Sequence, residues 1–595
     1  MLTLRKIQST ILTVCISAAS MLMTSCNDDD PSQPGNGTSN AQWSDINDVD
    51  LAGDMLIYEF DAAASWTATS AETWCTVLTE KGVAGKSSLR LKVEPNDGYM
   101  GRSTEVTVNV NGFAEPCRLT VRQGEGFLEK GDGRYRSVNE WMFDFMKEKY
   151  LWNEPIPELT LDYSLDYQKF LSSMLNGIAE FDDVNHDDGY WRDGERQAFY
   201  SYVSSNAPIS RAVGSKNTDS GLYLTATILG ENDNDPVGFA IFWVTPGSAA
   251  AEAGLKRGDF IDKVNGVAVT ELNYQSLGQA LLQGNVTVSL NDVKFNNKVA
   301  TVTSKGSVYV GSSTYTDPAI YSNKVLETTS GKKVGYLLYM GFSTDYDEQL
   351  IDIFKQFKAQ NVSELILDLR YNPGGEVLAS TVMGTLIAGS AHKGQVYVRT
   401  VYNAQRTAAG EVGEYKFGEA ANPEMGDYTR ITEAATNSLN LKKVYVIVSQ
   451  YTASASELVI NGLRGVDIDV NLIGTTTNGK NVGMEGVLGK FGGYSFTFYP
   501  ITFYCENAKG FRSYSEGFTP ELVVDDSTIY PGDFGTSDDI LSNMAINWAN
   551  SGVKPSTGSK ATTLSGQRVR TLRSSDEMQS PLSRRQGGSI MKLDR

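Results

Sequence analysis

A chain of 595 residues is too long for a single hydrophobic core, so several domains are expected. Its 41% hydrophobic and 21% charged residues are typical of globular proteins and exclude a globally disordered chain. The formal net charge of −19, without a basic stripe among aromatic residues, argues against nucleic acid as a partner.

The N-terminus has the pattern of an export signal. Arg5 and Lys6 precede an apolar run that ends at Met23, and small residues stand directly before Cys26. The run is shorter than the roughly 20 residues that span a bilayer. Residues 1–25 resemble a bacterial lipoprotein signal peptide, which implies lipidation of Cys26 and an exported lipoprotein of the outer membrane, on its periplasmic face or at the cell surface. An ordinary cleavage site with an incidental cysteine is the alternative.

Two segments follow, a tether and a β-rich domain. Residues 26–44 are rich in Asp, Ser, Pro, Gly and Asn, which favours a flexible tether. Residues 45–124 contain short alternating strands broken by turns, a spacing that indicates an immunoglobulin-like β-sandwich. This span resembles the BACON domain through Trp66, Trp74, Asn96, Arg102 and Gln123.

Two features of the sandwich leave alternatives open. Its tryptophans either pack in the core or line a glycan-binding platform, and core packing is favoured because small sandwiches need large core residues. Cys75 and Cys117 either form a disulfide or remain free thiols.

The chain has no CxxC motif or Cys/His cluster, so no metal and no other cofactor is expected.

Residues 130–215 are predicted to form a helical subdomain. Apolar side chains recur at helical spacing from Trp141, and the sequence Tyr150-Leu-Trp resembles the N-terminal helical region of S41 peptidases. The acidic stretch around His186 lacks the glycine and the glutamate of an EF-hand at their required offsets, so we expect a solvated loop.

Residues 220–295 resemble a PDZ domain. The resemblance rests on Pro246-Gly-Ser-Ala-Ala-Ala-Glu-Ala-Gly-Leu and Gly258-Asp-Phe-Ile-Asp-Lys-Val-Asn-Gly. PDZ domains pair an extended peptide with a sheet edge and hold its carboxylate with backbone amides. The resemblance implies polypeptide substrates with free C-termini. It places the carboxylate-binding loop at Val237, Gly238 and Phe239, and a β-rich scaffold with a blocked groove is the alternative.

The last two segments differ strongly in composition. Residues 330–550 alternate strand-like and helix-like stretches, which predicts an α/β core. Residues 555–595 contain more Lys and Arg than Asp and Glu and have little apolar periodicity. A disordered basic tail is therefore expected.

The strongest chemical signal is a serine between a predicted strand and a predicted helix. Ser454 follows the strand-like residues 443–448, and such a turn exposes a hydroxyl near helix-terminal amides. An N-cap role is the alternative. The chain has only two histidines, His186 and His392, and neither is placed as a catalytic imidazole. A lysine whose pKa is lowered by burial is therefore the expected base.

Two further motifs complete the pattern. Lys480 lies on a turn flanked by glycines, and a Pro-Gly-Gly turn ends the strand-like run before residue 372. In order and type, the three motifs resemble the C-terminal processing proteases of peptidase family S41 over roughly residues 130–550. The resemblance implies a nucleophile, Ser454; a general base, Lys480; and oxyanion donors from Gly374 or Gly375 together with Ala455.

Two departures from the family pattern bear on activity. Met484 stands where many members have a glutamine that orients the lysine, so Glu485 or Thr452 replaces that contact or the enzyme is less active. The spacing from serine to lysine is one residue longer than expected, which leaves Ser456 as a second candidate nucleophile.

The combined prediction is a multidomain α+β protein. It contains an immunoglobulin-like sandwich, a helical subdomain, a PDZ domain and an α/β core of the ClpP/crotonase-like type. The predicted function is that of a serine endopeptidase acting on exported or unfolded proteins through a Ser-Lys dyad. The alternative is a catalytically weak or inactive surface lipoprotein that binds peptides or glycans, and the sequence does not indicate an oligomeric state.

Overall fold

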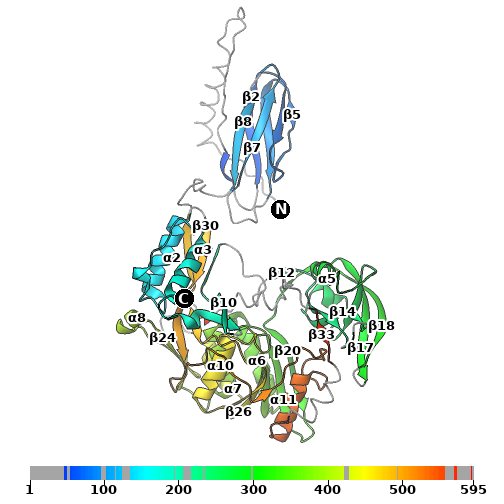
Figure 1. Ribbon diagram of the computed structural model, residues 1–595, viewed down its shortest axis with the longest axis vertical. Helices are drawn as coiled ribbons and strands as arrows, with labels where there is room; N and C mark the ends of the chain where they lie inside the picture. Colours follow the sequence, from blue (N-terminus) through cyan, green and yellow to red (C-terminus); the bar gives the residue numbers. More distant parts are fainter. Residues whose placement is uncertain are drawn as a thin grey trace, which may run out of the picture.

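The computed structural model arranges the chain in four folded parts (Figure 1). The predicted signal peptide, the predicted tether and Asn96 lie outside the described residues. Within the described part, no helix is long and apolar enough to cross a membrane. The described residues are 46–49, 54–94, 102–113, 116–123, 135–192, 194–205, 216–230, 232, 235–296, 299–420, 428–491, 494–556, 568–572 and 591–592.

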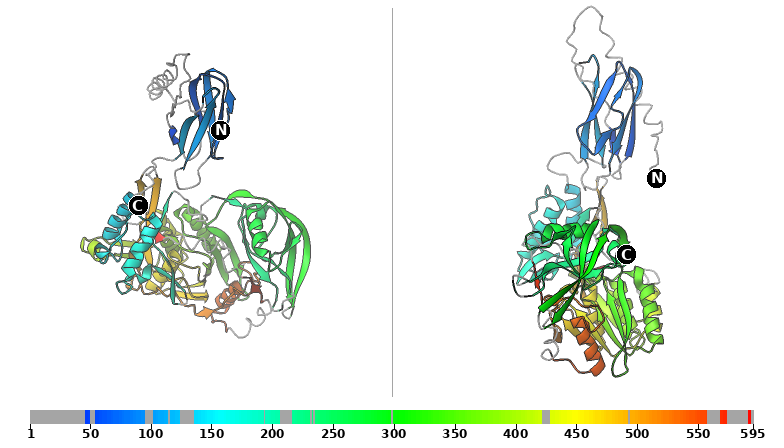
Figure 2. Two further views of the ribbon diagram at one scale, coloured as in Figure 1. Left: turned by 45° about the horizontal axis from the view of Figure 1, so that its top comes forward. Right: turned by 90° about the vertical axis from the view of Figure 1, so that its right-hand side faces the viewer.

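A β-sandwich forms the first part and stands apart from the others in both further views (Figure 2). Its strands are β1 (Ile46–Val49), β2 (Asp54–Ala62), β3 (Trp66–Ser70), β4 (Cys75–Val77), β5 (Lys81–Gly82), β6 (Gly85–Val93), β7 (Arg102–Val110) and β8 (Cys117–Gln123). The two sheets have the orders β1-β8-β7-β3-β5 and β2-β6-β4. Trp66 is buried in the core, whereas Trp74 is half-buried against the Arg102 guanidinium. Cys75 and Cys117 are not joined by a disulfide.

The second part mixes helices with strands, where the sequence predicts a helical subdomain. Its elements are α2 (Arg136–Lys149), η1 (Ile156–Glu158), α3 (Tyr167–Ala179), η2 (His186–Asp188), β9 (Gly189–Arg192), β10 (Glu195–Phe199) and β11 (Tyr202–Ser205). Strand β11 pairs antiparallel with β30 (Tyr494–Tyr499), which also pairs with β29 (Val487–Phe491). The apolar faces of α2 and α3 pack against this small sheet, so the subdomain is joined to the C-terminal half of the chain.

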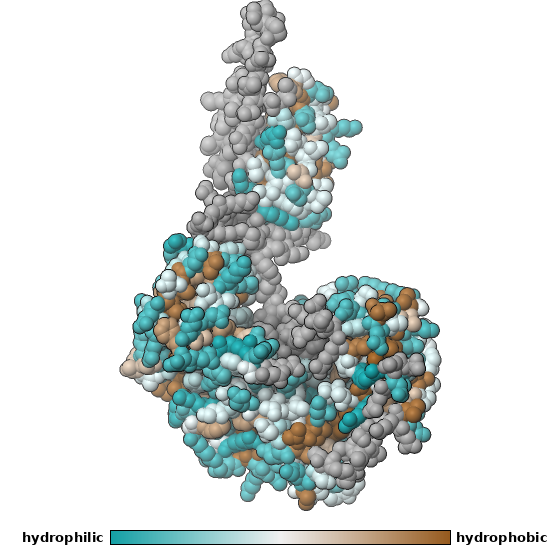
Figure 3. Space-filling view, viewed as in Figure 1, coloured by the Kyte–Doolittle hydropathy of each residue, from teal (hydrophilic) through white to brown (hydrophobic). Residues whose placement is uncertain are grey.

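The third part is the predicted PDZ domain. Its elements are β13 (Leu222–Ile228), β14 (Val237–Val244), α4 (Ala249–Glu252), β15 (Phe260–Val264), β16 (Val267–Ala268), α5 (Tyr274–Gln283), β17 (Val286–Asn296) and β18 (Val299–Val310); β12 (Lys216–Asp219) and β19 (Ser313–Thr316) form a ribbon beside it. The sheet order is β18-β17-β15-β14-β13-β33, where β33 is Arg570–Thr571. Apolar residues gather on the surface of this lobe (Figure 3). Leu272 and Val299 are among the exposed ones.

The fourth part is an α/β core, as the sequence predicts. Its sheet has the order β20-β21-β22-β26-β27-β32, and all neighbours except β20 and β21 run parallel. Helices α6, α7 and α10 cover one face, and α11 covers the other. The bounds are β20 (Ile320–Glu327), β21 (Lys333–Tyr339), η3 (Thr344–Tyr346), α6 (Asp347–Ala359), β22 (Glu364–Asp368), α7 (Val377–Ala388), α9 (Arg430–Thr436), β26 (Lys443–Val448), α10 (Ala455–Gly465), β27 (Asp469–Gly474), β32 (Leu522–Val523) and α11 (Ile540–Ser551).

A second sheet of the core includes part of the tail. Its order is β23-β34-β28-β31-β24-β25. The bounds are β23 (Gly375–Glu376), β24 (Val396–Tyr402), α8 (Ala404–Ala408), β25 (Gly413–Lys416), β28 (Val482–Met484), β31 (Ile501–Glu506) and β34 (Met591–Lys592). Strands β33 and β34 both lie in residues 555–595, so the prediction of a disordered tail is wrong for residues 568–572 and 591–592.

Candidate active site

The predicted nucleophile lies at a sharp turn between a core strand and a helix. Strand β26 ends at Val448, and α10 begins directly after Ser454. Ser454 has φ 58° and ψ −118°, a backbone conformation that is costly for a residue with a Cβ. Its side chain is fully buried, and its hydroxyl has no hydrogen-bond partner among the described residues. A strained, unpartnered hydroxyl is typical of a reactive group rather than of a structural one.

The second candidate serine is held by the fold. The Ser456 hydroxyl donates to the backbone oxygen of Asn372 at 3.0 Å. The Asn372 side chain in turn donates to the Tyr339 oxygen and accepts from the Gly374 amide at 2.9 Å. Ser456 therefore anchors the glycine turn beside α10, and the geometry favours Ser454 as the reactive serine.

Lys480 is fully buried close to this turn. Burial lowers the pKa of its amine to about 7, although the charges of Asp188 and Glu457 act in the opposite direction. The Nζ atom lies 3.8 Å from the sulfur of Met484 and 4.7 Å from the centroid of the Tyr200 ring. A lysine in such surroundings is partly neutral at physiological pH and can accept a proton.

A buried carboxylate that the sequence analysis missed connects the two predicted catalytic residues. Glu457 Oε2 accepts from the backbone amides of Ser454 and Lys480, each at 2.9 Å. Its Oε1 accepts from the Gly479 amide at 2.7 Å and from the Thr477 hydroxyl at 2.6 Å. Because one oxygen binds both amides, the backbones of Ser454 and Lys480 are neighbours. Burial raises the pKa of Glu457 to about 7 despite these four bonds.

The sequence did contain a signal for this carboxylate. Ser454 and Glu457 have the spacing of a capping box, in which a glutamate three residues after the N-cap binds the N-cap amide. The Ser454 amide makes this bond to Glu457. What the motif could not reveal is the additional bond to Lys480, which lies 23 positions further along the chain.

The acidic stretch of the second part closes one side of the lysine site, contrary to the expected solvated loop. Asp188 is fully buried and accepts from the Tyr150 hydroxyl at 2.7 Å and from the Ser201 amide at 2.8 Å. Burial raises the pKa of Asp188 to about 6. The neighbouring Asp187 accepts from the side-chain amide of Asn481 at 3.2 Å, next to the lysine.

The predicted oxyanion donors have different surroundings. The amide of Gly374 already donates to Asn372, and a Cβ at Gly374 would lie 2.7 Å from the Ser454 Cβ. Gly374 therefore permits the close approach of the turn to the serine. Ala455 is the first residue of α10, so its amide has no acceptor within that helix. Gly375, in β23, is the other remaining candidate donor.

The two residues expected to replace the missing glutamine bind other groups. Glu485 forms a buried ion pair with Arg406. The Thr452 hydroxyl donates to the Leu369 oxygen at 2.8 Å and accepts from the Ser449 amide. Both side chains are used elsewhere in the fold, and Met484 itself faces the lysine amine.

The predicted carboxylate-binding residues lie inside the sheet. Val237, Gly238 and Phe239 are in β14, which pairs with β13 on one side and with β15 on the other. A Cβ at Gly238 would lie 2.4 Å from the Ile261 backbone oxygen. This geometry contradicts the predicted placement, because the outer strand on this side of the PDZ-like domain is β13.

The histidines are not part of the site described above. His186 Nδ1 lies 2.9 Å from Asp183, and its ring stacks on Trp191. His392 is half-buried and interacts with Gln395. Within the described residues, no group of three or more His, Cys, Asp and Glu side chains is placed to hold a metal ion.

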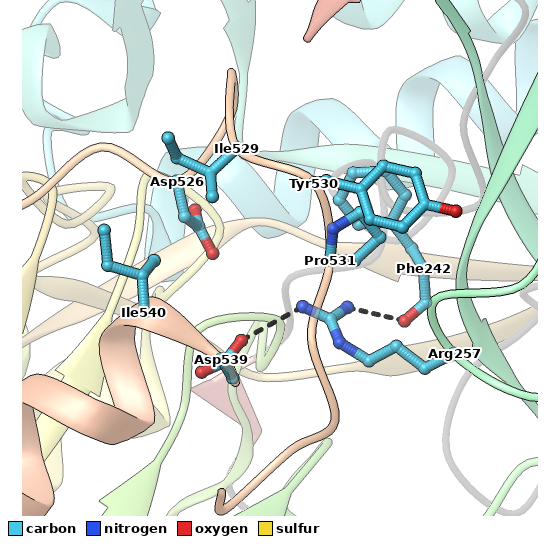
Figure 4. Close-up of a pocket in the computed structure, with 8 residues that line it drawn as sticks. All are labelled: Phe242, Arg257, Asp526, Ile529, Tyr530, Pro531, Asp539 and Ile540. Carbon is cyan, nitrogen blue, oxygen red and sulfur yellow. Dashed lines mark hydrogen bonds and ion pairs between the residues drawn. The ribbon is translucent and has the colours of Figure 1, made fainter. Parts of the chain in front are cut away.

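A buried charge cluster joins the PDZ-like domain to the core. Arg257 interacts with Asp539 at 3.2 Å and with the Phe242 backbone oxygen, in a small pocket (Figure 4). Asp539 also pairs with Arg370, which follows strand β22, at 2.7 Å. Burial alone would raise the pKa of Asp539, but the two guanidinium groups hold it below its usual range. The cluster fixes the PDZ-like domain beside the strand that leads to the glycine turn.

Comparison with known families identifies the class of protein. Residues 333–524 match Peptidase family S41, and residues 137–202 match the Peptidase S41 N-terminal domain. Residues 241–291 match a PDZ domain, and residues 64–124 match BACON, an N-terminal binding domain. The chain is thus a multidomain protein built around a peptidase family S41 domain.

Individual relatives agree with this class. The chain is 25% identical over 237 residues to a carboxyl-terminal-processing protease of Picosynechococcus sp., covering 40% of this chain and 49% of that protein. It is 27% identical over 234 residues to the carboxy-terminal processing protease CtpA of Bacillus subtilis, covering 39% and 42%. The chain therefore spans slightly less than half the length of these curated relatives. A crystal structure of a candidate S41 protease from Bacteroides fragilis matches with a TM-score of 0.55 and 27% identity, covering 69% of this chain and 97% of that one.

Proposed function

We propose that the protein is a serine endopeptidase of the C-terminal processing type, with Ser454 as nucleophile and Lys480 as general base. The observation that carries this proposal is the buried carboxylate of Glu457, which binds the backbone amides of both residues. The unpartnered hydroxyl of Ser454 and the lowered pKa of Lys480 are the second and third supports.

In the proposed reaction, the Ser454 oxygen bonds to the carbonyl carbon of the scissile peptide while Lys480 Nζ takes the hydroxyl proton. The carbonyl oxygen becomes an oxyanion, for which the amides of Gly375 and Ala455 are the proposed donors. The carbon–nitrogen bond then breaks, and the lysine proton passes to the leaving amine. Water cleaves the resulting ester by the same route, releasing a carboxylic acid and restoring the serine hydroxyl.

The proposed substrates are exported or unfolded polypeptides captured through the PDZ-like domain. The proposed location is the outer membrane, with a lipid anchor at Cys26, on the periplasmic face or at the surface. A binding protein without turnover is the second candidate, and Met484 favours it. A thioether is a weak acceptor, so it orients the lysine amine less well than an amide oxygen would. Glycan binding by the sandwich belongs to this second candidate.

The test is cleavage of an unfolded protein by the purified chain, with products identified by mass spectrometry. Ser454→Ala and Lys480→Ala should each abolish cleavage while the protein stays folded. Ser456→Ala is the matched control, because that hydroxyl is used within the fold, and it should remain active. Undiminished cleavage by folded Ser454→Ala would refute the proposed nucleophile. Absence of cleavage by the unmodified protein, together with retained peptide binding, would favour the second candidate.

A further inference from the structure

The outer edge of the PDZ-like sheet is paired with the chain's own tail. Strand β33 runs antiparallel to β13, with Thr571 opposite Thr227 and Arg570 opposite Ile228. The Leu572 amide extends this ladder by donating to the Ala226 oxygen at 2.9 Å. The tail segment of residues 568–572 therefore adds a strand to the sheet, as an extended peptide does when it binds a PDZ edge.

Side chains of the tail segment also contact this surface. Arg570 donates through Nη2 to the Asn232 oxygen at 2.9 Å and through Nε to the Gly230 oxygen at 3.3 Å. Val569 is buried in a small apolar cluster with residues of the PDZ-like sheet and with Tyr530 of the core. Leu572 packs against the PDZ-like core. The segment is thus held by an arginine and by the aliphatic side chains on either side of it.

The tail segment is bound from the core side as well. The Val569 amide donates to the Thr528 oxygen at 2.8 Å, and Arg568 forms a β-bridge with Ile529. Residues 528–530 belong to the stretch that lines the pocket containing Arg257 and Asp539. The tail segment therefore lies between the PDZ-like edge and the core, at the junction that the buried charge cluster fixes.

A second tail strand reaches the candidate active site. Strand β34 runs parallel to β23, with Met591 opposite Gly375 and Lys592 opposite Glu376. It also pairs with β28, where Lys592 lies opposite Met484. One neighbour thus carries a proposed oxyanion donor, and the other carries the residue that faces Lys480. Strand β34 thus lies between β23 and β28 in the second sheet of the core. An extended substrate would have to pair with these same strands to reach the residues that they carry.

We propose that the tail is a cis ligand that occupies the PDZ edge and the substrate position, so that a substrate must displace it. The ligand that fits the β13 edge is an internal peptide segment with the pattern aliphatic-Arg-Thr-aliphatic. The edge recognises this segment through its arginine and not through a free carboxylate. Occupancy of the edge follows from the ladder alone, whereas inhibition of cleavage rests on the proposed function. Tethering favours the cis ligand, because a short linker gives an effective concentration of about millimolar.

The proposal is tested with a pair of charge substitutions in the full chain. Val569→Asp places a carboxylate in the apolar cluster, whereas Thr571→Asp places the same charge on an exposed side chain two residues further along the tail segment. Amide exchange in residues 222–230 should rise in Val569→Asp and stay unchanged in Thr571→Asp. A labelled peptide with the sequence of residues 566–575 should bind Val569→Asp about tenfold more tightly than the unmodified chain. If Val569→Asp fails to fold, Arg570→Ala, which removes two bonds to carbonyl oxygens, takes its place.

Both measurements are made in the Ser454→Ala background, so they do not depend on proteolysis. Equal exchange and equal peptide affinity in the two charge variants would overturn the cis-ligand proposal. In the active background, Val569→Asp should lower KM for an unfolded substrate, and Thr571→Asp should not. Enhanced peptide binding with unchanged KM would overturn the inhibitory part and leave the ligand assignment standing. Absence of cleavage in every variant would instead count against the proposed function.

Discussion

Glu457→Gln is the most direct test of how the candidate dyad is held together. The substitution replaces one carboxylate oxygen by an NH2 group. When that group stands at the position of Oε2, it faces the N–H groups of Ser454 and Lys480, which then have no acceptor. A buried donor without a partner costs about 1–3 kcal/mol. The free energy of unfolding of the core should therefore fall by about 2–6 kcal/mol.

The effect on catalysis should exceed the effect on folding. Without the shared carboxylate, Ser454 and Lys480 lose the contact that fixes their relative position, and a displacement of about 1 Å can cost roughly 10²-fold in rate. We expect kcat/KM to fall by about that factor at a temperature where the variant is fully folded. Scanning calorimetry follows the core transition, since a chain of several domains does not unfold in two states.

The matched control is Glu485→Gln. Glu485 is also buried and close to the lysine in sequence, but its carboxylate pairs with Arg406, whereas that of Glu457 binds the dyad amides. This variant should lose stability because it removes the charge of one of the two carboxylates that pair with the buried Arg406, yet it should retain most of its kcat/KM when folded. A folded Glu457→Gln variant with kcat/KM within about twofold of the unmodified protein would refute the reasoning.

Four further predictions follow from the site, the N-terminus and the PDZ-like domain. Activity should rise with pH through about 7, because the proposed base is Lys480. His186→Ala and His392→Ala should have the same pH profile as the unmodified protein. A changed profile in either folded variant would implicate a histidine. The same lowered pKa makes stability rise with pH between about 7 and the usual lysine value, since the folded state binds fewer protons there; urea unfolding of Lys480→Met should lose this dependence. Cys26→Ser should release the protein from membranes, and membrane retention of that variant would contradict the lipid anchor. A substrate with an amidated C-terminus should be cleaved with a higher KM if a free carboxylate is captured, whereas equal KM values would favour recognition of an internal segment.

The sequence predicted the elements that depend on local patterns. The α/β alternation of the core, the β-sandwich and the strand-to-helix turn at Ser454 are all present, because apolar periodicity and turn residues determine them locally. Burial of Trp66 is confirmed for the same reason: a small sandwich has few other large side chains for its core.

Contacts between distant segments could not be predicted in the same way. The run of residues 237–244 indicates a buried strand, but periodicity does not reveal that both of its edges are paired. The tail lacks apolar periodicity because its strands β33 and β34 are only two residues long each, too short to show a repeat. The burial of Asp188 likewise depends on Tyr150 and Ser201, whose positions only the folded subdomain defines.

Asp188 offers a final test of how the second part influences the chemistry. Its negative charge favours the protonated form of Lys480 and so opposes the lowering of the lysine pKa by burial. Asp188→Asn removes this charge but keeps an oxygen that can accept from the Tyr150 hydroxyl or from Ser201. The pKa of Lys480 should then fall further, and the acidic limb of the kcat/KM profile should move to lower pH. Asp187→Asn is the control, because Asp187 accepts a hydrogen bond from the Asn481 side chain. This variant should shift the kcat/KM profile less than Asp188→Asn does. A shift to higher pH in folded Asp188→Asn, or none, would show that Asp188 does not act on the base.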